Sequence, residues 1–278
     1  MRQWIIAGLT VSLSVALWSC GPSGETGRPT GLATKESLFR AGHELYLMQE
    51  FDSALVLLKR SAACDSSYVS PLADLAALYH DLGTQQHGEK NPKRLEYFRA
   101  SRSYFARMEA LGMREADIYE RLCELSVVLD DDRTFLKYAR KNAELYPYDR
   151  QYYNLGVASF GAGEYQNVIR TQKEALQKFK QSPYLGGFYR YMGHAYMKVD
   201  RDQTAERVLT TGVQAVGARI GELKKGGGNY TMTEEFRRLN DDKIGMLLLL
   251  KRLHQVYKAG DKLEQVECQL REAGHTKQ

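Results

Sequence analysis

The stretch YYNLGVASFGAGEYQNVIRTQKEAL, residues 152–176, decides the fold because its pattern occurs twice more in the chain. Residues 39–61 read FRAGHELYLMQEFDSALVLLKRS, and residues 189–209 read YRYMGHAYMKVDRDQTAERVL. In each copy a glycine is followed twelve positions later by a small or branched residue: Gly42 and Ala54, Gly156 and Val168, Gly193 and Ala205. Self-similar segments of this length indicate a chain built from repeated supersecondary units.

The three copies resemble the tetratricopeptide repeat, a unit of about 34 residues that folds as two antiparallel helices. Two looser copies begin near Val69 and Ala116, and the first of these carries an insertion around GTQQHGEKNPKR. The resemblance implies an all-α fold, a right-handed α-solenoid of about five helix hairpins over residues 35–217. Gly42, Gly156 and Gly193 then mark the places where the two helices of a hairpin come close together.

Local signals predict several helix ends. Asn91 followed by Pro92 is typical of a helix N-cap and first helical residue. Gly83, Gly112 and Gly260 are predicted to be left-handed residues at helix C-termini, and Pro147 ends a helix. After Gly217 the pattern loosens, so residues 218–278 are predicted to be a loop followed by two capping helices, about 233–258 and 261–273.

The N-terminus has the layout of a signal peptide, with one arginine followed by an apolar run from Trp4 to Trp18. The tetrad Leu17-Trp18-Ser19-Cys20 resembles the lipobox of bacterial lipoproteins, which implies a signal peptide over residues 1–19 and acyl chains, palmitate among them, on Cys20. Residues 20–34, rich in glycine, would form a flexible tether. The alternatives are a simple secretory signal and an uncleaved apolar anchor.

No motif for catalysis, nucleotide binding or metal binding occurs in the sequence, so we expect no enzymatic activity, no cofactor and no metal site. The six histidines include no pair at a spacing of three or four. The formal net charge of +5 is spread among interleaved acidic and basic residues, which does not favour nucleic-acid binding. Cys64, Cys123 and Cys268 lack zinc-site spacing, and the sequence leaves open whether two of them form a disulfide.

The resemblance also implies a concave groove lined by the first helix of each repeat. Its expected lining residues are Phe39, His43, Tyr46, Tyr153, Val157, Phe160, Arg190, His194 and Met197. Large rings at such positions favour an extended or helical peptide as the ligand, because they bury much area at low entropic cost. For each histidine, a solvated or internally paired side chain is the ordinary alternative.

Together these features predict a membrane-tethered scaffold or adaptor lipoprotein that mediates protein–protein interactions at the bacterial cell envelope. The expected location is the outer membrane, facing the periplasm, with other envelope proteins or peptides as partners. Accessory subunits of outer-membrane assembly, pilus or secretion machines are similar lipoproteins. The alternative is a periplasmic carrier or sensor that binds a small glycan or lipid fragment in the aromatic-lined groove.

Overall fold

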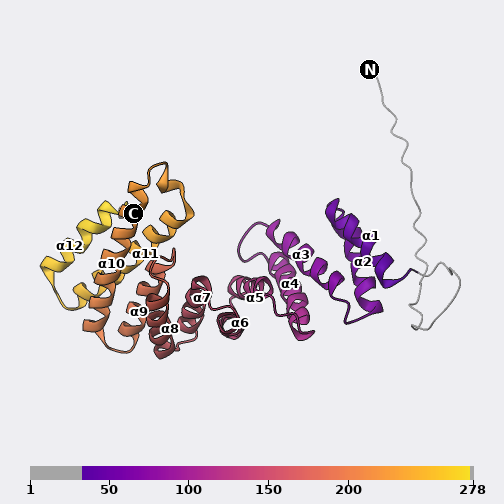
Figure 1. Ribbon diagram of the computed structural model, residues 1–278, viewed down its shortest axis with the longest axis horizontal. Coiled ribbons are helices and arrows are strands. Elements are labelled where there is room, and N and C mark those ends of the chain that lie inside the picture. The colour runs from indigo at the N-terminus through magenta and orange to yellow at the C-terminus, as the bar shows by residue number, and fades with distance from the viewer. Residues whose placement is uncertain (1–32, 276–278) are drawn as a thin grey trace, which may run out of the picture.

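The computed structural model describes residues 33–275, and its regular elements in this range are all helical (Figure 1). The helices are α1 (Lys35–Leu47), α2 (Phe51–Cys64), α3 (Val69–Thr84), α4 (Pro92–Ala110), α5 (Ala116–Val128), α6 (Asp132–Leu145), α7 (Asp149–Gly161), α8 (Tyr165–Lys178), α9 (Leu185–Lys198), α10 (Asp202–Lys225), the short 3₁₀ helix η1 (Tyr230–Met232), α11 (Glu234–Val256) and α12 (Gly260–Glu272). They stack as successive hairpins along one axis, which confirms the predicted α-solenoid. Residues 1–32, with the predicted signal peptide and Cys20, lie outside the described residues.

The three signature glycines lie where the helices of a hairpin meet. A Cβ atom added at Gly42 would lie 2.9 Å from Cγ of Leu58, and one at Gly193 would lie 2.5 Å from Cγ of Leu209. At Gly156 an added Cβ would collide with the Gln172 side chain. The predicted close approach is therefore confirmed. The opposing side chain comes sixteen positions after each glycine, about one helical turn beyond the residue singled out by the sequence pattern.

A left-handed residue recurs in the turn between the two helices of a repeat. It lies seven positions after the small residue of the repeat pattern, which is Gly42, Cys123, Gly156 or Gly193. These residues are Gln49 (φ 63°), Asp130 (φ 53°), Gly163 (φ 76°) and Asp200 (φ 57°). In repeat two this position is Gly83, which remains helical because α3 continues to Thr84 and Gly83 packs beneath the Phe98 ring. The prediction of a left-handed Gly83 is thus wrong.

Among the other predicted helix ends, those at Gly112 and Asn91 are confirmed and the one at Gly260 is wrong. Gly112 has a φ of 92°, as predicted, and the Asn91 side chain accepts hydrogen bonds from the backbone N–H groups of Lys93 and Arg94. Gly260 was predicted wrongly, because it begins α12 and Lys258 adopts the left-handed conformation instead.

Helix α10 continues eight residues beyond Gly217, so the loop predicted from residue 218 begins only at Gly226. The extension is held because Ile220 and Leu223 pack on the C-terminal core, while Arg219 forms an ion pair with Glu235 at 2.9 Å. The two capping helices begin and end within two residues of their predicted limits. Thr233 caps α11 by accepting a hydrogen bond from the N–H of Phe236.

The hydrophobic core consists of two large clusters joined by a small one. The first is built from α2, α3, α5 and α6 with neighbouring residues, and the second from α9 to α12. Between them Tyr152, Ala175 and Phe188 form a small cluster. The same region buries several polar side chains, among them Gln151, Ser159 and Gln172. Repeat four is therefore the least apolar part of the core.

Candidate interaction groove

The first helices of the hairpins form the inner side of the solenoid and the second helices form the outer side. Helix α1 contacts α3, α7 contacts α9, and α9 contacts α11, whereas neighbouring second helices in the described part of the chain make no comparable contacts. Stacked hairpins must curve toward the side on which their helices are closer together. The groove is therefore lined by α1, α3, α5, α7, α9 and α11.

In the N-terminal half of the groove, side chains of successive first helices pair with one another. His43 Nδ1 lies 2.7 Å from Asp74 Oδ2, and the Tyr46 hydroxyl donates a hydrogen bond to Asp81 at 2.7 Å. His43 and Tyr46, both predicted to line the groove, thus take part in contacts from α1 to α3. For His43 the ordinary alternative, an internally paired histidine, describes what the structure shows.

The ladder of pairs continues to α7. His80 Nε2 lies 3.7 Å from Glu124, and Glu120 forms an ion pair with Arg150 at 2.7 Å. Contact with His80, assisted by Arg121, lowers the pKa of Glu124 to about 2. Because these charges are already paired, this half of the groove offers few free groups to a ligand.

In the C-terminal half the groove carries a continuous run of rings, which we call the aromatic track. It consists of Tyr184, Tyr153, Tyr191, Phe160 and His194, whose successive ring centroids are 5.0, 5.9, 5.8 and 4.5 Å apart. The rings come alternately from α7 and from α9 or the residue before it. This spacing falls within the range of favourable aromatic pairs.

The sequence predicted Tyr153, Phe160 and His194, and the structure brings these three residues together in the track. The sequence pattern did not predict two other members of the track, Tyr184, which precedes α9, and Tyr191, which follows the predicted Arg190. All nine predicted lining residues are partly exposed. Val157 packs against the N-terminal core cluster and Met197 against the C-terminal one, while Phe39 contacts the Tyr68 ring instead of the track.

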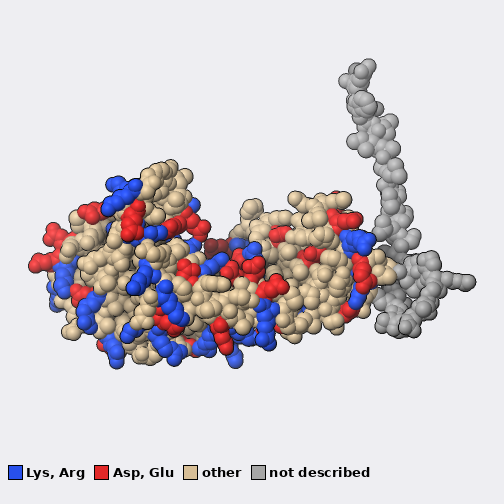
Figure 2. Space-filling view, viewed as in Figure 1, with Lys and Arg blue, Asp and Glu red and all other residues tan. Residues whose placement is uncertain are grey.

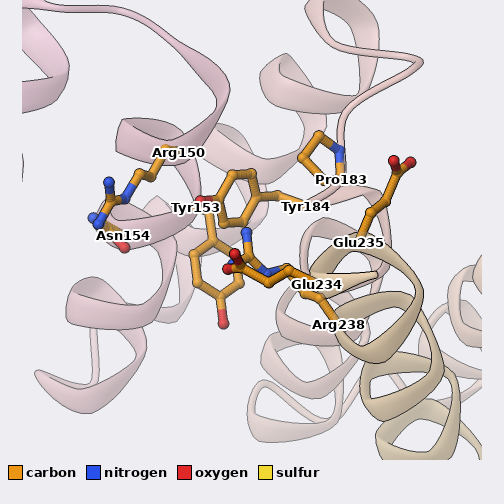
Figure 3. Close-up of a pocket in the computed structure, with 8 residues that line it drawn as sticks. All are labelled: Arg150, Tyr153, Asn154, Pro183, Tyr184, Glu234, Glu235 and Arg238. Atoms are coloured by element: carbon orange, nitrogen blue, oxygen red, sulfur yellow. The ribbon is translucent and has the colours of Figure 1, made fainter. Parts of the chain in front are cut away.

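A cavity of about 650 Å³ opens beside Tyr153 (Figure 3). Its lining residues are Arg150, Tyr153, Asn154, Pro183, Tyr184, Glu234, Glu235 and Arg238. The guanidinium of Arg238 stacks over the Tyr184 ring at 4.2 Å and also pairs with Glu234. The Asn154 amide makes no hydrogen bond to any described residue. A free amide beside two tyrosines can both donate to and accept from a ligand.

A second cavity, of about 630 Å³, shares Tyr153, Glu234 and Arg238 with the first and reaches the buried Asp242. Asp242 is 3% exposed and its Oδ1 lies 3.2 Å from Nη1 of Arg190. Burial raises the pKa of Asp242 to about 6, against the opposing effect of Arg190. Gly186 and Gly187 make room for this arrangement, because added Cβ atoms would collide with Asp242 and Tyr153.

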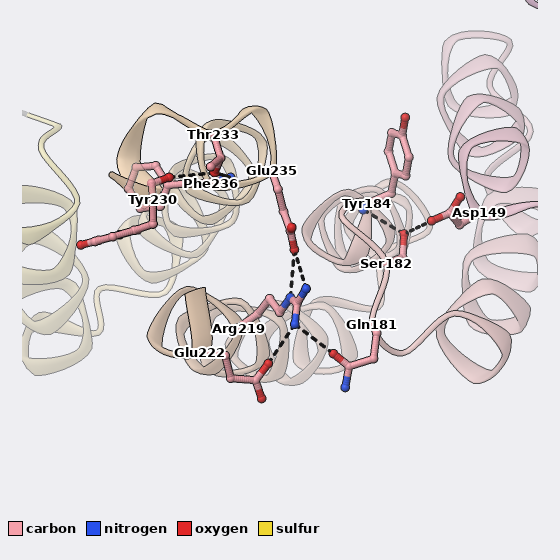
Figure 4. A network of polar contacts seen from close by, with 10 residues as sticks. All are labelled: Asp149, Gln181, Ser182, Tyr184, Arg219, Glu222, Tyr230, Thr233, Glu235 and Phe236. Atoms are coloured by element: carbon pink, nitrogen blue, oxygen red, sulfur yellow. Dashed lines mark hydrogen bonds and ion pairs between the residues drawn. The ribbon is translucent and has the colours of Figure 1, made fainter. Parts of the chain in front are cut away.

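The far wall of the cavities consists of the beginning of α11, which Arg219 near the end of α10 holds in place (Figure 4). Its guanidinium contacts Glu235, Glu222 and Gln181. The repeat pattern does not predict this wall, because its position depends on the continuation of α10 beyond Gly217, where the pattern predicts a loop. The wall is held by the contacts of Arg219 with Glu235, 16 residues away in the sequence, and with Gln181, 38 residues away.

The described residues include no cluster of histidine, cysteine or acidic side chains suited to a metal ion. Cys123 and Cys268 carry free thiols, so no disulfide joins any two of Cys64, Cys123 and Cys268. Burial raises the pKa of the Cys123 thiol to about 12, which makes it a packing residue. None of the described helices is long and apolar enough to cross a bilayer.

Comparison with solved structures places the fold among tetratricopeptide-type solenoids. MamA superimposes with a TM-score of 0.50 at 16% sequence identity, over 67% of this chain and 94% of MamA. YrrB, described as a TPR protein with an unusual peptide-binding site, gives 0.49 at 14% identity over 64% of this chain and 84% of its own. PilF of Pseudomonas aeruginosa gives 0.44 at 16% identity, over 86% and 90%.

No family model matches the chain, and no curated protein matches its sequence. At these identities the likeness concerns the fold alone. The protein has the fold of a tetratricopeptide-type α-solenoid, and its function has to be argued from its own groove.

Proposed function

We propose that the protein is a scaffold, tethered to the bacterial cell envelope, which binds a segment of a partner protein on the aromatic track. The observation that carries the proposal is the contrast between the two halves of the groove. The N-terminal half is occupied by internal pairs such as His43 with Asp74. The C-terminal half instead presents partly exposed rings next to an open cavity.

The chemistry of the track suits a peptide. Tyrosine and phenylalanine rings bury large areas without the entropic cost of long flexible chains. The amide of Asn154 carries a donor and an acceptor that match the N–H and C=O of a peptide group. A segment of a partner lying over Tyr153 and Phe160 would bring its backbone past this amide.

The test is retention of partners on immobilised residues 32–278, which include every described residue. We expect one or more envelope proteins to be retained specifically, and retention to fall when Tyr153→Ala and Phe160→Ala are combined. Tyr148→Ala is the matched control, because Tyr148 is 64% exposed in the same repeat and outside the track. Equal retention by the double variant and the parent would refute binding on the track.

The size of the cavity supports a second candidate, a carrier or sensor for a small glycan or lipid fragment. Its volume of about 650 Å³ is in the range of small-molecule sites, and arginine, glutamate, asparagine and tyrosine side chains can bind sugar hydroxyls. Thermal stabilisation by sugars or lipid fragments, without any retained protein, would favour this candidate over the scaffold.

The tether and the location are part of the same proposal. The lipobox-like tetrad ending at Cys20 supports a lipid anchor, and its sequence context supports the periplasmic face of the outer membrane. We expect Cys20→Ala to release the protein from membranes after a high-salt wash. A variant that still sediments with membranes under this wash would refute the anchor.

A further inference from the structure

Charge is divided unequally between the two sides of the solenoid. The second helices of the five repeats, α2, α4, α6, α8 and α10, carry eighteen lysines and arginines against nine aspartates and glutamates, a formal charge of +9. The first helices, α1, α3, α5, α7 and α9, carry six against eight, a formal charge of −2. The linear sequence shows only interleaved charges, because first and second helices alternate along the chain; the basic side emerges only when the helices are stacked.

The excess of positive charge on the outer face includes exposed cations that no ion pair engages. Glu109 pairs with Lys141 and Glu174 with Lys178 on these helices, and Glu164 at the N-cap of α8 pairs with Arg140. The exposed cations on second helices that have no acidic partner among the described residues include Arg60, Lys93, Arg99, Arg133, Lys137 and Lys173. Figure 2 shows lysine and arginine side chains along the lower edge of the molecule.

The exposed positions of these helices suit electrostatic contact with a broad surface. Large exposed apolar side chains on them are few, with Val56 and Leu145 as the examples among the described residues. Nothing on this face therefore resembles a hydrophobic anchor. The cations are spread over four helices, a layout that fits an extended surface of negative charge better than a narrow ligand.

We propose that the outer face of the second helices binds the surface of an anionic bilayer. Each basic residue near such a surface contributes about 1 kcal/mol at ordinary ionic strength, and the attraction decays within a Debye length. Binding on this side leaves the groove directed away from the lipid and open to partners. The face is separate from the aromatic track, so the proposal stands independently of what the groove binds.

The experiment uses residues 21–278, which contain every described residue and cannot carry the lipid proposed for Cys20. Co-sedimentation is measured with vesicles of phosphatidylethanolamine and phosphatidylglycerol, and with pure phosphatidylcholine as the neutral reference. We expect binding to the anionic vesicles that falls at least about tenfold when salt is raised from about 20 mM to about 500 mM. No binding to anionic vesicles, or equal binding to both compositions, would overturn the proposal.

Two variants with the same change in net charge locate the surface. Arg133→Glu, Lys137→Glu and Lys173→Glu are combined on the outer face, whereas Arg40→Glu, Arg252→Glu and Arg271→Glu are combined on α1, α11 and α12. The first variant should lose about tenfold or more in vesicle affinity and the second about twofold or less. Equal losses would assign the binding to net charge instead of the outer face, and so contradict the proposal.

Duplex DNA serves as the competing polyanion in the same assay. Tight binding of DNA together with absent binding of anionic vesicles would assign the outer face to nucleic acid and would overturn the proposal. The Cys20→Ala experiment remains distinct, because it measures membrane association after a high-salt wash that removes electrostatic binding.

Discussion

At the scale of single residues, the groove depends on a buried carboxylate. Asp242 is almost inaccessible, and its Oδ2 has no hydrogen-bond partner among the described residues. Arg190 compensates part of the cost of burial from one side. A carboxylate that is poorly solvated in the folded state holds its proton more tightly there than in the unfolded chain. Stability should therefore depend on pH through this residue.

The sign follows from the raised pKa of Asp242, which is about 6 in the folded protein against 3.8 ordinarily. The folded state binds more protons between these values, so the contribution of Asp242 to stability decreases as pH rises through about 6. We expect the parent to lose stability relative to Asp242→Asn over this window, by up to roughly 1 kcal/mol per pH unit. Urea unfolding of both proteins between about pH 4 and pH 7 measures this. A difference that does not vary with pH would contradict the assignment.

Gln49 offers a test of backbone strain. It has a φ of 63° in the turn between α1 and α2, where repeat four has Gly163. A side chain in the left-handed region costs about 1 kcal/mol, part of which is offset by the greater freedom of glycine in the unfolded chain. We expect Gln49→Gly to raise stability by about 0.5 kcal/mol. Gly163→Gln should lower it, and a stabilising effect of this reverse change would refute the explanation.

At the scale of helices and turns, sequence predicted the close contacts better than the ends of elements. The repeated glycines located the contacts at Leu58 and Leu209 to within a turn, because a missing side chain has one steric consequence wherever the pattern recurs. The ends of α3 and α10 were missed for a different reason. Gly83 and Gly217 have low helix propensity, but packing of Phe98, Ile220 and Leu223 outweighs it.

The aromatic track shows the same limit. Tyr153, Phe160 and His194 follow from the phase of the repeat, since each lies on a first helix at a groove-facing position. Tyr184 precedes its helix and joins the track only because Gly187 lets Tyr153 approach α9. Its role depends on a tertiary contact that the repeat pattern does not contain.

Two glycine-to-alanine substitutions distinguish the effect of close helix packing on stability from the effect of helix propensity. Both Gly156 and Gly217 lie in helices with negative φ, but an added Cβ collides with Gln172 at the first and meets nothing within 4 Å at the second. We expect Gly156→Ala to destabilise the protein by about 1–3 kcal/mol. Gly217→Ala should stabilise it by about 0.5–1 kcal/mol. Thermal unfolding measures both, and a neutral Gly156→Ala would show that the hairpin contact is not tight.

At the scale of the whole molecule, repeat four separates two hydrophobic cores. The small cluster around Tyr152 and Phe188 joins them, and polar side chains occupy much of the surrounding interior. In a solenoid each repeat is stabilised by its own contacts and those with its neighbours. A poorly apolar repeat in the middle should therefore weaken the coupling between the two halves, one with the paired ladder and the other with the aromatic track.

Amide hydrogen exchange should reveal this weak coupling as faster exchange in α7 and α8 than in α3, α5 and α10. Asn142 provides a direct way to alter it. The residue is 1% exposed in α6, and neither atom of its amide has a hydrogen-bond partner among the described residues. Burying an unsatisfied amide costs about 1–3 kcal/mol, so Asn142→Leu should stabilise the protein and slow exchange in α7 and α8. Leu145→Asn, a polar change at a residue of the same helix that is 43% exposed, should leave that exchange unchanged. If the middle repeat is protected as well as the flanking ones in the parent, the solenoid unfolds as one unit and the division into halves is wrong.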